Sequence, residues 1–129
     1  MHRIVDSRCV LAVRNLMVST RYYTEVLGFR RDPIEAAGWS FLSRDNFKLM
    51  IGECPDEKPA GELGDHSYFV HLRVEGVDQF HAEISGRGGD VISKPADKPW
   101  GLREFSVRTP DGYRITFGEL ISEIPHKFI

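Results

Sequence analysis

The chain has 129 residues, which is enough for one domain with a buried core. A hydrophobic fraction of 41%, a charged fraction of 28% and a net charge of -2 are ordinary for a globular protein, and they argue against nucleic-acid or membrane partners. The apolar runs are too short for a membrane span or a signal peptide, and Cys9 and Cys54 alone make no disulfide framework, so we expect a cytoplasmic protein.

The first half of the chain predicts a strand, a helix and three further strands. Residues 9–13 form an apolar run typical of a buried strand. Asn15 then predicts a helix N-cap, and Gly28 predicts the end of that helix. Short strand-like segments follow at 29–35, 39–43 and 47–53, and the stretch 54–65, rich in Pro, Gly and acids, predicts a loop. The predicted apolar face of the helix consists of Leu16, Thr20, Tyr23 and Leu27.

The same order of elements then starts again. Residues 68–74 predict a strand, and Val77, Phe80 and Ile84 predict one face of a helix that ends in the glycine-rich segment 86–89. Strands are predicted at 90–94, at 102–108 and, after a turn at 110–112, at 113–120.

A repeated nonapeptide links the two halves. Residues 45–53 (DNFKLMIGE) return without a gap as residues 111–119 (DGYRITFGE). The repeating unit is too long for a solenoid, so it indicates a duplicated supersecondary module. We therefore predict an α+β fold of two tandem β-α-β-β-β modules within one domain, residues 1–129. Module one covers about residues 7–55, module two about 66–120, and residues 121–129 form a C-terminal tail.

Three segments carry a resemblance to a known family: VRNLMVSTRYYTEVLGF (13–29), HLRVEGVDQFHAEISGRGG (71–89) and PWGLREFSVRTPDGYRITFGE (99–119). Together they resemble the glyoxalase/bleomycin-resistance/extradiol dioxygenase superfamily, also called vicinal oxygen chelate proteins. The run at 99–105 is more similar to the bleomycin-resistance branch. The resemblance implies an open, curved mixed sheet and a homodimer, paired side by side or by exchange of modules. The apolar tail 124–129 is expected to cover part of the uncovered sheet surface.

The resemblance also implies a divalent metal held at four equivalent strand positions. Counting along the strands places these positions at Arg8, Met50, Phe69 and Thr116. Arginine is a permanent cation, phenylalanine has no donor atom, and a thioether and a hydroxyl are poor ligands for such a metal. Moving the register by two residues brings in His71 but does not complete a set. We therefore predict neither a metal nor another cofactor.

Strand alternation predicts which side chains share the open face of the sheet with these four positions. The opposite face is predicted to carry apolar residues beneath the helices, together with Trp39, Phe41, Phe47 and Tyr113. The open face is thus predicted to be polar and basic. Its predicted members, besides the four, are Val10, Ala12, Ser40, Leu42, Lys48, His71, Arg73, Glu104, Ser106, Arg108 and Arg114.

The predicted ligand-binding residues are Arg8, Met50, Phe69, His71, Trp100, Glu104 and Thr116. The resemblance implies that an aromatic in the loop of Trp100 stacks on a bound drug, although Trp100 could instead cover a sheet edge. The leading hypothesis is a metal-independent small-molecule-binding protein that sequesters a drug or metabolite, as in antibiotic resistance. The alternative is a superfamily enzyme, a lyase, isomerase or dioxygenase-like protein, with His71 as acid or base. The basic face predicts an anionic or neutral planar ligand, stacked on Trp100 and paired with Arg8.

Overall fold

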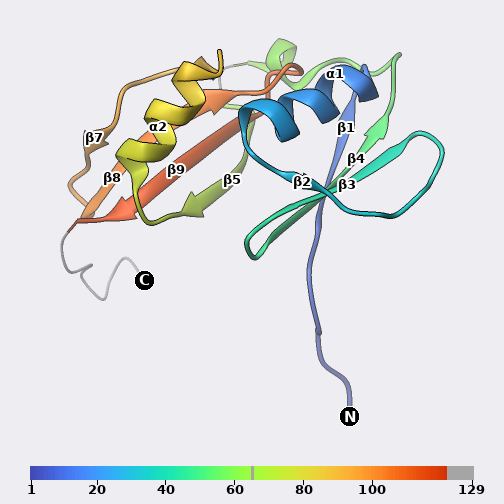
Figure 1. The fold of residues 1–129 in the computed structure, drawn as a ribbon, viewed down its shortest axis with the longest axis horizontal. Coiled ribbons are helices and arrows are strands. Elements are labelled where there is room, and N and C mark those ends of the chain that lie inside the picture. Colours follow the sequence, from blue (N-terminus) through green and yellow to red (C-terminus); the bar gives the residue numbers. More distant parts are fainter. Residues whose placement is uncertain (65, 122–129) are drawn as a thin grey trace. The chain divides into compact units, whose positions relative to one another are not determined.

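The computed structural model describes residues 1–64 and 66–121 of the chain (Figure 1). The predicted role of the tail segment 124–129 lies outside the described residues. The chain divides into two compact units, Met1–Pro59 and Ala60–Ile129, and each is described by itself. Within the described residues, no helix is both long and apolar enough to cross a membrane.

Unit 1 holds a four-stranded mixed sheet in the order β1-β4-β3-β2. β1 and β4 are parallel, whereas β4, β3 and β2 are joined as antiparallel neighbours. The helical segment lies between β1 and β2 in the chain and packs on β3 and β4 (Figure 1). Its elements are β1 (Cys9–Val13), α1 (Leu16–Arg21), the π-helical turn η1 (Tyr22–Val26), β2 (Arg30–Arg31), β3 (Trp39–Arg44) and β4 (Phe47–Glu53).

Unit 2 repeats this plan with a five-stranded sheet. The order is β5-β9-β8-β6, with β7 also paired to β8, and β5 runs parallel to β9. Helix α2 packs on β8, β9 and β6, and Figure 1 shows it lying across β8 and β9. The elements are the 3-10 turn η2 (Ala60–Leu63), β5 (Tyr68–Arg73), α2 (Val77–Gly86), β6 (Asp90–Val91), β7 (Ala96–Asp97), β8 (Leu102–Arg108) and β9 (Arg114–Leu120).

The predicted fold class is confirmed, and the differences concern the short elements. The strand predicted at 29–35 is only Arg30–Arg31, and the strand predicted at 90–94 is only Asp90–Val91. β7 was not predicted. Two- or three-residue strands carry too few residues for an alternating pattern, so the sequence signal cannot define their ends. The first helix begins after Asn15, whose side chain accepts a hydrogen bond from Val18 N, as predicted.

Each unit has its own apolar core between helix and sheet. In unit 1, Tyr23 contacts Phe29, and Phe29 contacts Phe47, in edge-to-face geometry above the buried Leu49 and Leu42. In unit 2, Phe105 and Phe117 stack with ring centroids 5.0 Å apart, and Val77 and Ile84 of α2 are buried with them. The core is therefore built twice, from equivalent strands, as the duplication predicts.

The last residue of the repeated nonapeptide has the same task in both units. Glu53, at the end of β4, accepts a hydrogen bond from Leu16 N at the start of α1, at 2.9 Å. Glu119, at the equivalent place in β9, accepts from Gly76 N and Val77 N at 2.9 and 3.1 Å. A carboxylate at a helix N-terminus satisfies free amide groups and complements the helix dipole. The repeated Glu thus ties the last strand of each unit to its helix.

These amide contacts predict how acid affects unit 2. The Gly76 and Val77 amides hold the pKa of Glu119 below its ordinary range, so its charged form contributes stability that is lost as pH falls through the lowered pKa. We expect Glu119→Gln to unfold more easily than wild type at neutral pH. The difference should shrink below about pH 4, near the ordinary pKa of Glu. Urea unfolding at several pH values measures this.

Glu75→Gln removes the same charge from an exposed position just before α2 and is the matched control. A deficit of the same size in Glu75→Gln, or one in Glu119→Gln that does not become smaller as the pH is lowered to the limit at which the protein stays folded, would contradict the capping role.

The open face of unit 1 differs from its prediction in one strand. Ser40 and Leu42 were predicted to lie on the open face, but they pair with Ile51 and Leu49 and are buried beneath the helix. A hydrogen bond between the hydroxyls of Ser40 and Thr20, at 2.8 Å, confirms this side. The prediction was wrong because the tight turn after Arg44 pairs that residue with Phe47, which reverses the assumed alternation of β3.

The same register places two aromatic residues on the open face instead of the helix-covered face. Trp39 and Phe41 were predicted to face the helix, yet they pair with Gly52 and Met50 on the open face. Phe47 lies on the core side, as predicted, in contact with Phe29. The open face of unit 1 is consequently more apolar than expected.

Candidate functional site

A cavity of about 580 Å³ opens on the sheet of unit 2. Five of the seven predicted ligand-binding residues line it, while Arg8 and Met50 belong to unit 1. The predictions did not include Tyr68, Ser93 or Lys98 among the binding residues. The lining consists of Tyr68, Phe69, Val70, His71, Ser93, Lys98, Trp100, Glu104, Phe105, Ser106, Arg114 and Thr116.

The carboxylate of Glu104 organises this cavity. Its Oε2 accepts a hydrogen bond from Trp100 Nε1 at 2.9 Å and lies 2.9 Å from His71 Nε2. A carboxylate only accepts hydrogen bonds, so Nε2 of His71 carries the proton in this contact. The side chain of Glu104 is 11% exposed, compared with 44% for His71. One oxygen therefore fixes both the indole and the imidazole.

The repeated glycine of β9 makes room for this group. Gly118 pairs with Glu104 on one side and with Arg73 on the other, directly beneath the imidazole. A Cβ at Gly118 would lie 2.8 Å from His71 Cε1 and 3.3 Å from Glu104 Cγ. The nonapeptide thus supplies a flat floor on which the His71–Glu104 pair rests.

We predict that Gly118→Ala separates His71 from Glu104. The added methyl group would be closer to the imidazole than nonbonded carbons approach, and the exposed histidine can move away from it. The loss of stability should be small, below about 1 kcal/mol, because a flexible side chain yields. Nitrogen chemical shifts of the His71 ring would report the lost contact.

Gly86→Ala is the control, because a Cβ at Gly86 meets nothing within 4 Å. An unchanged His71 spectrum in Gly118→Ala would show that the glycine floor does not determine the pair.

Two hydroxyl groups form the deeper part of the same face. Ser106 Oγ and Thr116 Oγ1 lie 2.8 Å apart, and both residues are buried. His71 pairs with Thr116 across β5 and β9, and Ser106 pairs with Thr116 across β8 and β9. Predicted open-face positions in β8 and β9 are thus confirmed for these residues.

A β-bulge shifts the first strand of unit 2 by one residue. Tyr68, not Phe69, is in register with Arg114, because the irregularity lies between Tyr68 and Val70. The guanidinium of Arg114 lies 4.9 Å from the centre of the Tyr68 ring, whereas Phe69 makes an edge contact with Tyr113. Bulges re-aim side chains in this way. The strand pattern carried no signal for the bulge, so Tyr68 was missed.

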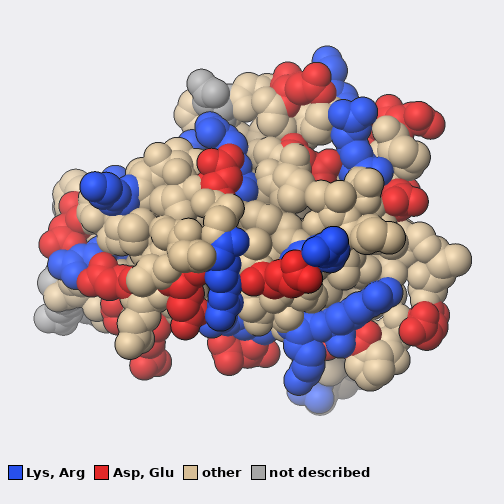
Figure 2. Space-filling view, turned by 45° about the horizontal axis from the view of Figure 1, so that its top comes forward, with Lys and Arg blue, Asp and Glu red and all other residues tan. Residues whose placement is uncertain are grey.

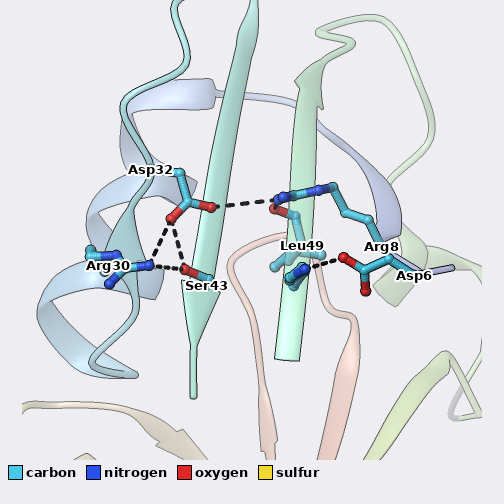
Figure 3. Close-up of polar contacts among 7 residues, drawn as sticks. Asp6, Arg8, Arg30, Asp32, Ser43 and Leu49 are labelled. Atoms are coloured by element: carbon cyan, nitrogen blue, oxygen red, sulfur yellow. Dashed lines mark hydrogen bonds and ion pairs between the residues drawn. The ribbon is translucent and has the colours of Figure 1, made fainter. Parts of the chain in front are cut away.

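Arg8 lies on the open face of unit 1, as predicted, but its charge is already engaged. It donates to Leu49 O at 3.2 Å and pairs with Asp32 at 3.6 Å (Figure 3). Its guanidinium also lies 5.5 Å from the centre of the Phe41 ring. Asp32 also accepts from Ser43; this bond, with Arg30 and Arg8, holds the pKa of Asp32 below its ordinary range. Arg8 is therefore part of a polar network within its own unit.

The other bases are distributed rather than gathered. Lys48 forms an ion pair with Asp6, and Arg103, outside the predicted face, bridges Asp78 and Asp97. Figure 2 shows basic and acidic side chains interspersed over the face in view. The lining of the cavity contains two basic residues, Lys98 and Arg114, and one carboxylate, that of Glu104. Of the predicted open-face bases, Arg114 lines the cavity, together with Lys98, which was not predicted.

The four positions counted as metal sites do not fit a metal in this chain. The Arg8 guanidinium contacts Asp32, the Phe69 ring contacts Tyr113, and the Thr116 hydroxyl contacts Ser106. Met50 offers only a thioether, a poor ligand for a hard or borderline cation. Within residues 1–64 and 66–121, no three His, Cys, Asp or Glu side chains form a group that could hold a metal ion.

Comparison with known proteins agrees with this duplicated fold. The sequence model described as Glyoxalase/Bleomycin resistance protein/Dioxygenase superfamily matches residues 7–117. The chain therefore belongs to the glyoxalase/bleomycin resistance protein/dioxygenase superfamily. No curated protein sequence matches the chain.

Solved structures show the same fold. A glyoxalase/bleomycin resistance protein/dioxygenase from Nocardioides is 20% identical with a TM-score of 0.78, over 97% of this chain and 89% of that one. TnmS3, an antibiotic-binding protein from Streptomyces sp. CB03234, is 22% identical with a TM-score of 0.74, over 93% and 98%. TioX from Micromonospora sp. ML1 is 25% identical with a TM-score of 0.71, over 89% and 98%.

Proposed function

We propose that this protein binds a small planar molecule without a metal, in the cavity of unit 2. The observation that carries the proposal is the cavity itself, which combines exposed aromatic rings, Tyr68 and Trp100, with a carboxylate held by two side chains. Its volume of about 580 Å³ lies within the usual range for small-molecule sites. A few fixed polar groups among aromatic walls are typical of such sites.

The charge of the cavity supports a neutral or anionic ligand. Lys98 and Arg114 line it together with the one carboxylate of Glu104. Charges in a partly desolvated cavity act more strongly than on open surface, so a cationic ligand should be disfavoured. A neighbouring structure described as an antibiotic-binding protein supports the further proposal that the ligand is a drug and the role antibiotic resistance.

A thermal-shift screen tests the binding proposal. Drugs, organic acids and thiol conjugates are added one by one, and a ligand of the native state raises Tm by mass action. The shift should be lost in Trp100→Ala and kept in Met17→Ala, which removes an exposed apolar side chain from α1. A ligand whose shift survives Trp100→Ala would place binding outside this cavity.

Metal independence is tested separately. Protein purified without chelator is analysed for metal and then titrated calorimetrically with nickel, zinc, manganese and iron. Stoichiometric, tight uptake that disappears in Thr116→Ala or His71→Ala would overturn this part of the proposal.

The second candidate is an enzyme of the superfamily, a lyase, isomerase or dioxygenase-like protein. The observation that favours it is the His71–Glu104 pair at 2.9 Å inside a cavity, because a paired imidazole and carboxylate can transfer a proton. Turnover of hemithioacetal or catechol substrates, lost in His71→Ala, would decide for the enzyme over the binder.

We further propose a cytoplasmic homodimer. Both cysteines are free thiols, which suits a reducing compartment. Each unit also has an open sheet face that a second copy could cover. Sedimentation at micromolar concentration should give twice the mass of the chain, and a compact monomer would contradict the dimer. Cell fractionation tests the location.

A further inference from the structure

The two oxygens of Glu104 are in different situations. Oε2 already has two partners, Trp100 Nε1 and His71 Nε2. Among the described residues, no donor contacts Oε1. Oε1 is not among the fully buried unpartnered side-chain atoms of the described residues, so it keeps some exposure to solvent, and Glu104 lines the cavity. A ligand that covers this oxygen must supply a donor, because an unpaired carboxylate oxygen is costly to desolvate.

The neighbours of Glu104 restrict which donor it can accept. Lys98 and Arg114 line the same cavity and oppose a cationic group, whereas a neutral O–H or N–H meets no such repulsion. Trp100 is held by its N–H, so its ring is oriented before a ligand arrives. Gly118 keeps the floor flat beneath His71 and Glu104. The free oxygen thus lies in the same cavity as a fixed aromatic plane.

We propose that Glu104 determines specificity, and that the ligand class is planar, neutral aromatic molecules with an O–H or N–H donor at the edge, such as phenols or lactams. The donor binds Oε1 of Glu104 while the ring stacks on Trp100. This inference rests on the proposed function, since it assigns a ligand class to the same cavity. It adds that the ligand must donate a hydrogen bond.

Three naphthalenes of similar size test the proposal by calorimetry and Trp fluorescence. At neutral pH, 2-naphthol is a neutral donor, 2-methoxynaphthalene has only an acceptor oxygen, and 2-naphthoate is an anion. Hydrogen bonds to charged groups correspond to roughly tenfold or more in affinity. We expect wild type to bind 2-naphthol about tenfold more tightly than 2-methoxynaphthalene, and more tightly than 2-naphthoate.

Glu104→Gln should remove this preference. The amide oxygen would keep the Trp100 hydrogen bond, and the amide NH₂ would then point to the ligand as a donor. Binding of 2-naphthol should weaken severalfold, because its oxygen can accept only a neutral hydrogen bond from the amide in place of the one it donated to the carboxylate. Since 2-methoxynaphthalene can also accept from the amide and should bind no more weakly than before, the difference between the two ligands should largely disappear. Glu75→Gln, an exposed charge change outside the cavity, should leave all three affinities unchanged.

The comparison of 2-naphthol with 2-methoxynaphthalene uses the wild-type protein alone. The proposal can therefore be tested even if the Glu104→Gln variant folds poorly. Equal binding of 2-naphthol and 2-methoxynaphthalene, with a Trp100-dependent response, overturns the donor requirement but leaves the proposed function in place. If 2-naphthoate binds most tightly of the three and Glu104→Gln does not change its affinity, the donor requirement is likewise overturned and the proposed function stands. Lys98 or Arg114 would then be the residue that selects the ligand. If none of the three binds while the thermal-shift screen yields a Trp100-dependent ligand, the ligand class is wrong and the binding function stands.

Discussion

Gly112→Ala should lower the free energy of unfolding by about 3 kcal/mol or more, a loss expected only from backbone strain or core damage. Gly112 has φ +85°, a conformation that costs other residues roughly 1–2 kcal/mol. In addition, a Cβ there would lie 2.4 Å from the Cα of Gly61. Because the obstacle is backbone, the loop before β5 would have to move, together with the bond from Gly61 N to Asp111 O. Urea unfolding of the variant measures the loss.

Gly88→Ala separates the cost of the positive φ from the cost of the contact with Gly61. Gly88 has nearly the same φ, +82°, but a Cβ there meets nothing within 4 Å. This control should lose only about 1–2 kcal/mol. Equal losses in the two variants would show that the contact with Gly61 contributes nothing.

Phe105→Ala should destabilise unit 2 by about 3–5 kcal/mol, the range for removing a buried aromatic ring. Phe105 is 1% exposed and stacks on Phe117, with His81 at its edge. It also lies between Glu104 and Ser106 in β8, so its loss should loosen the strand that carries both cavity residues. Denaturant unfolding followed by Trp fluorescence gives the magnitude.

Leu120→Ala is the matched control, because Leu120 ends β9 and is 39% exposed. Leu120→Ala should lower the free energy of unfolding by well under half of the amount expected for Phe105→Ala. A loss in Phe105→Ala no greater than in Leu120→Ala would mean that the Phe105–Phe117 stack is not the centre of this core.

The duplication made most of the fold predictable from the sequence. The nonapeptides 45–53 and 111–119 both lead into a strand that carries, at or next to its last residue, a glutamate bound to a helix start. Apolar spacing also identified both helices. The sequence could not define β2, β6 and β7, since elements of two residues depend on their partners rather than on a pattern of their own.

The orientation of β3 shows a different limit. A tight turn at Asp45 and Asn46 pairs Arg44 with Phe47, whereas the longer connection between β8 and β9 pairs Arg108 with Arg114. The two connections hold two and five residues, and an odd difference in length exchanges the two faces of the preceding strand relative to its partner. Hence Trp39 and Phe41 were placed on the wrong side, while Glu104 and Ser106 were placed correctly.

The residues of the candidate site could be predicted where strands alternate regularly. They could not be predicted where a backbone irregularity or the path of a loop determines the position of a side chain. His71, Glu104 and Thr116 follow from alternation in β5, β8 and β9. The bulge beside Phe69 has no sequence signature, and it gives Tyr68 the place assigned to Phe69. That Trp100 would donate to Glu104 depends on the path of a loop, which spacing alone does not determine.

The glutamates at the two helix starts also have a consequence for phosphate-bearing molecules. Free amides at the beginning of a helix are a common docking point for phosphate and other anions. Here Glu53 and Glu119 already occupy these amides with negative charge of their own. A nucleotide or sugar phosphate would therefore be repelled at both places. Inorganic phosphate, even at millimolar concentration, should neither raise Tm nor shift the amide signals of Leu16, Gly76 and Val77.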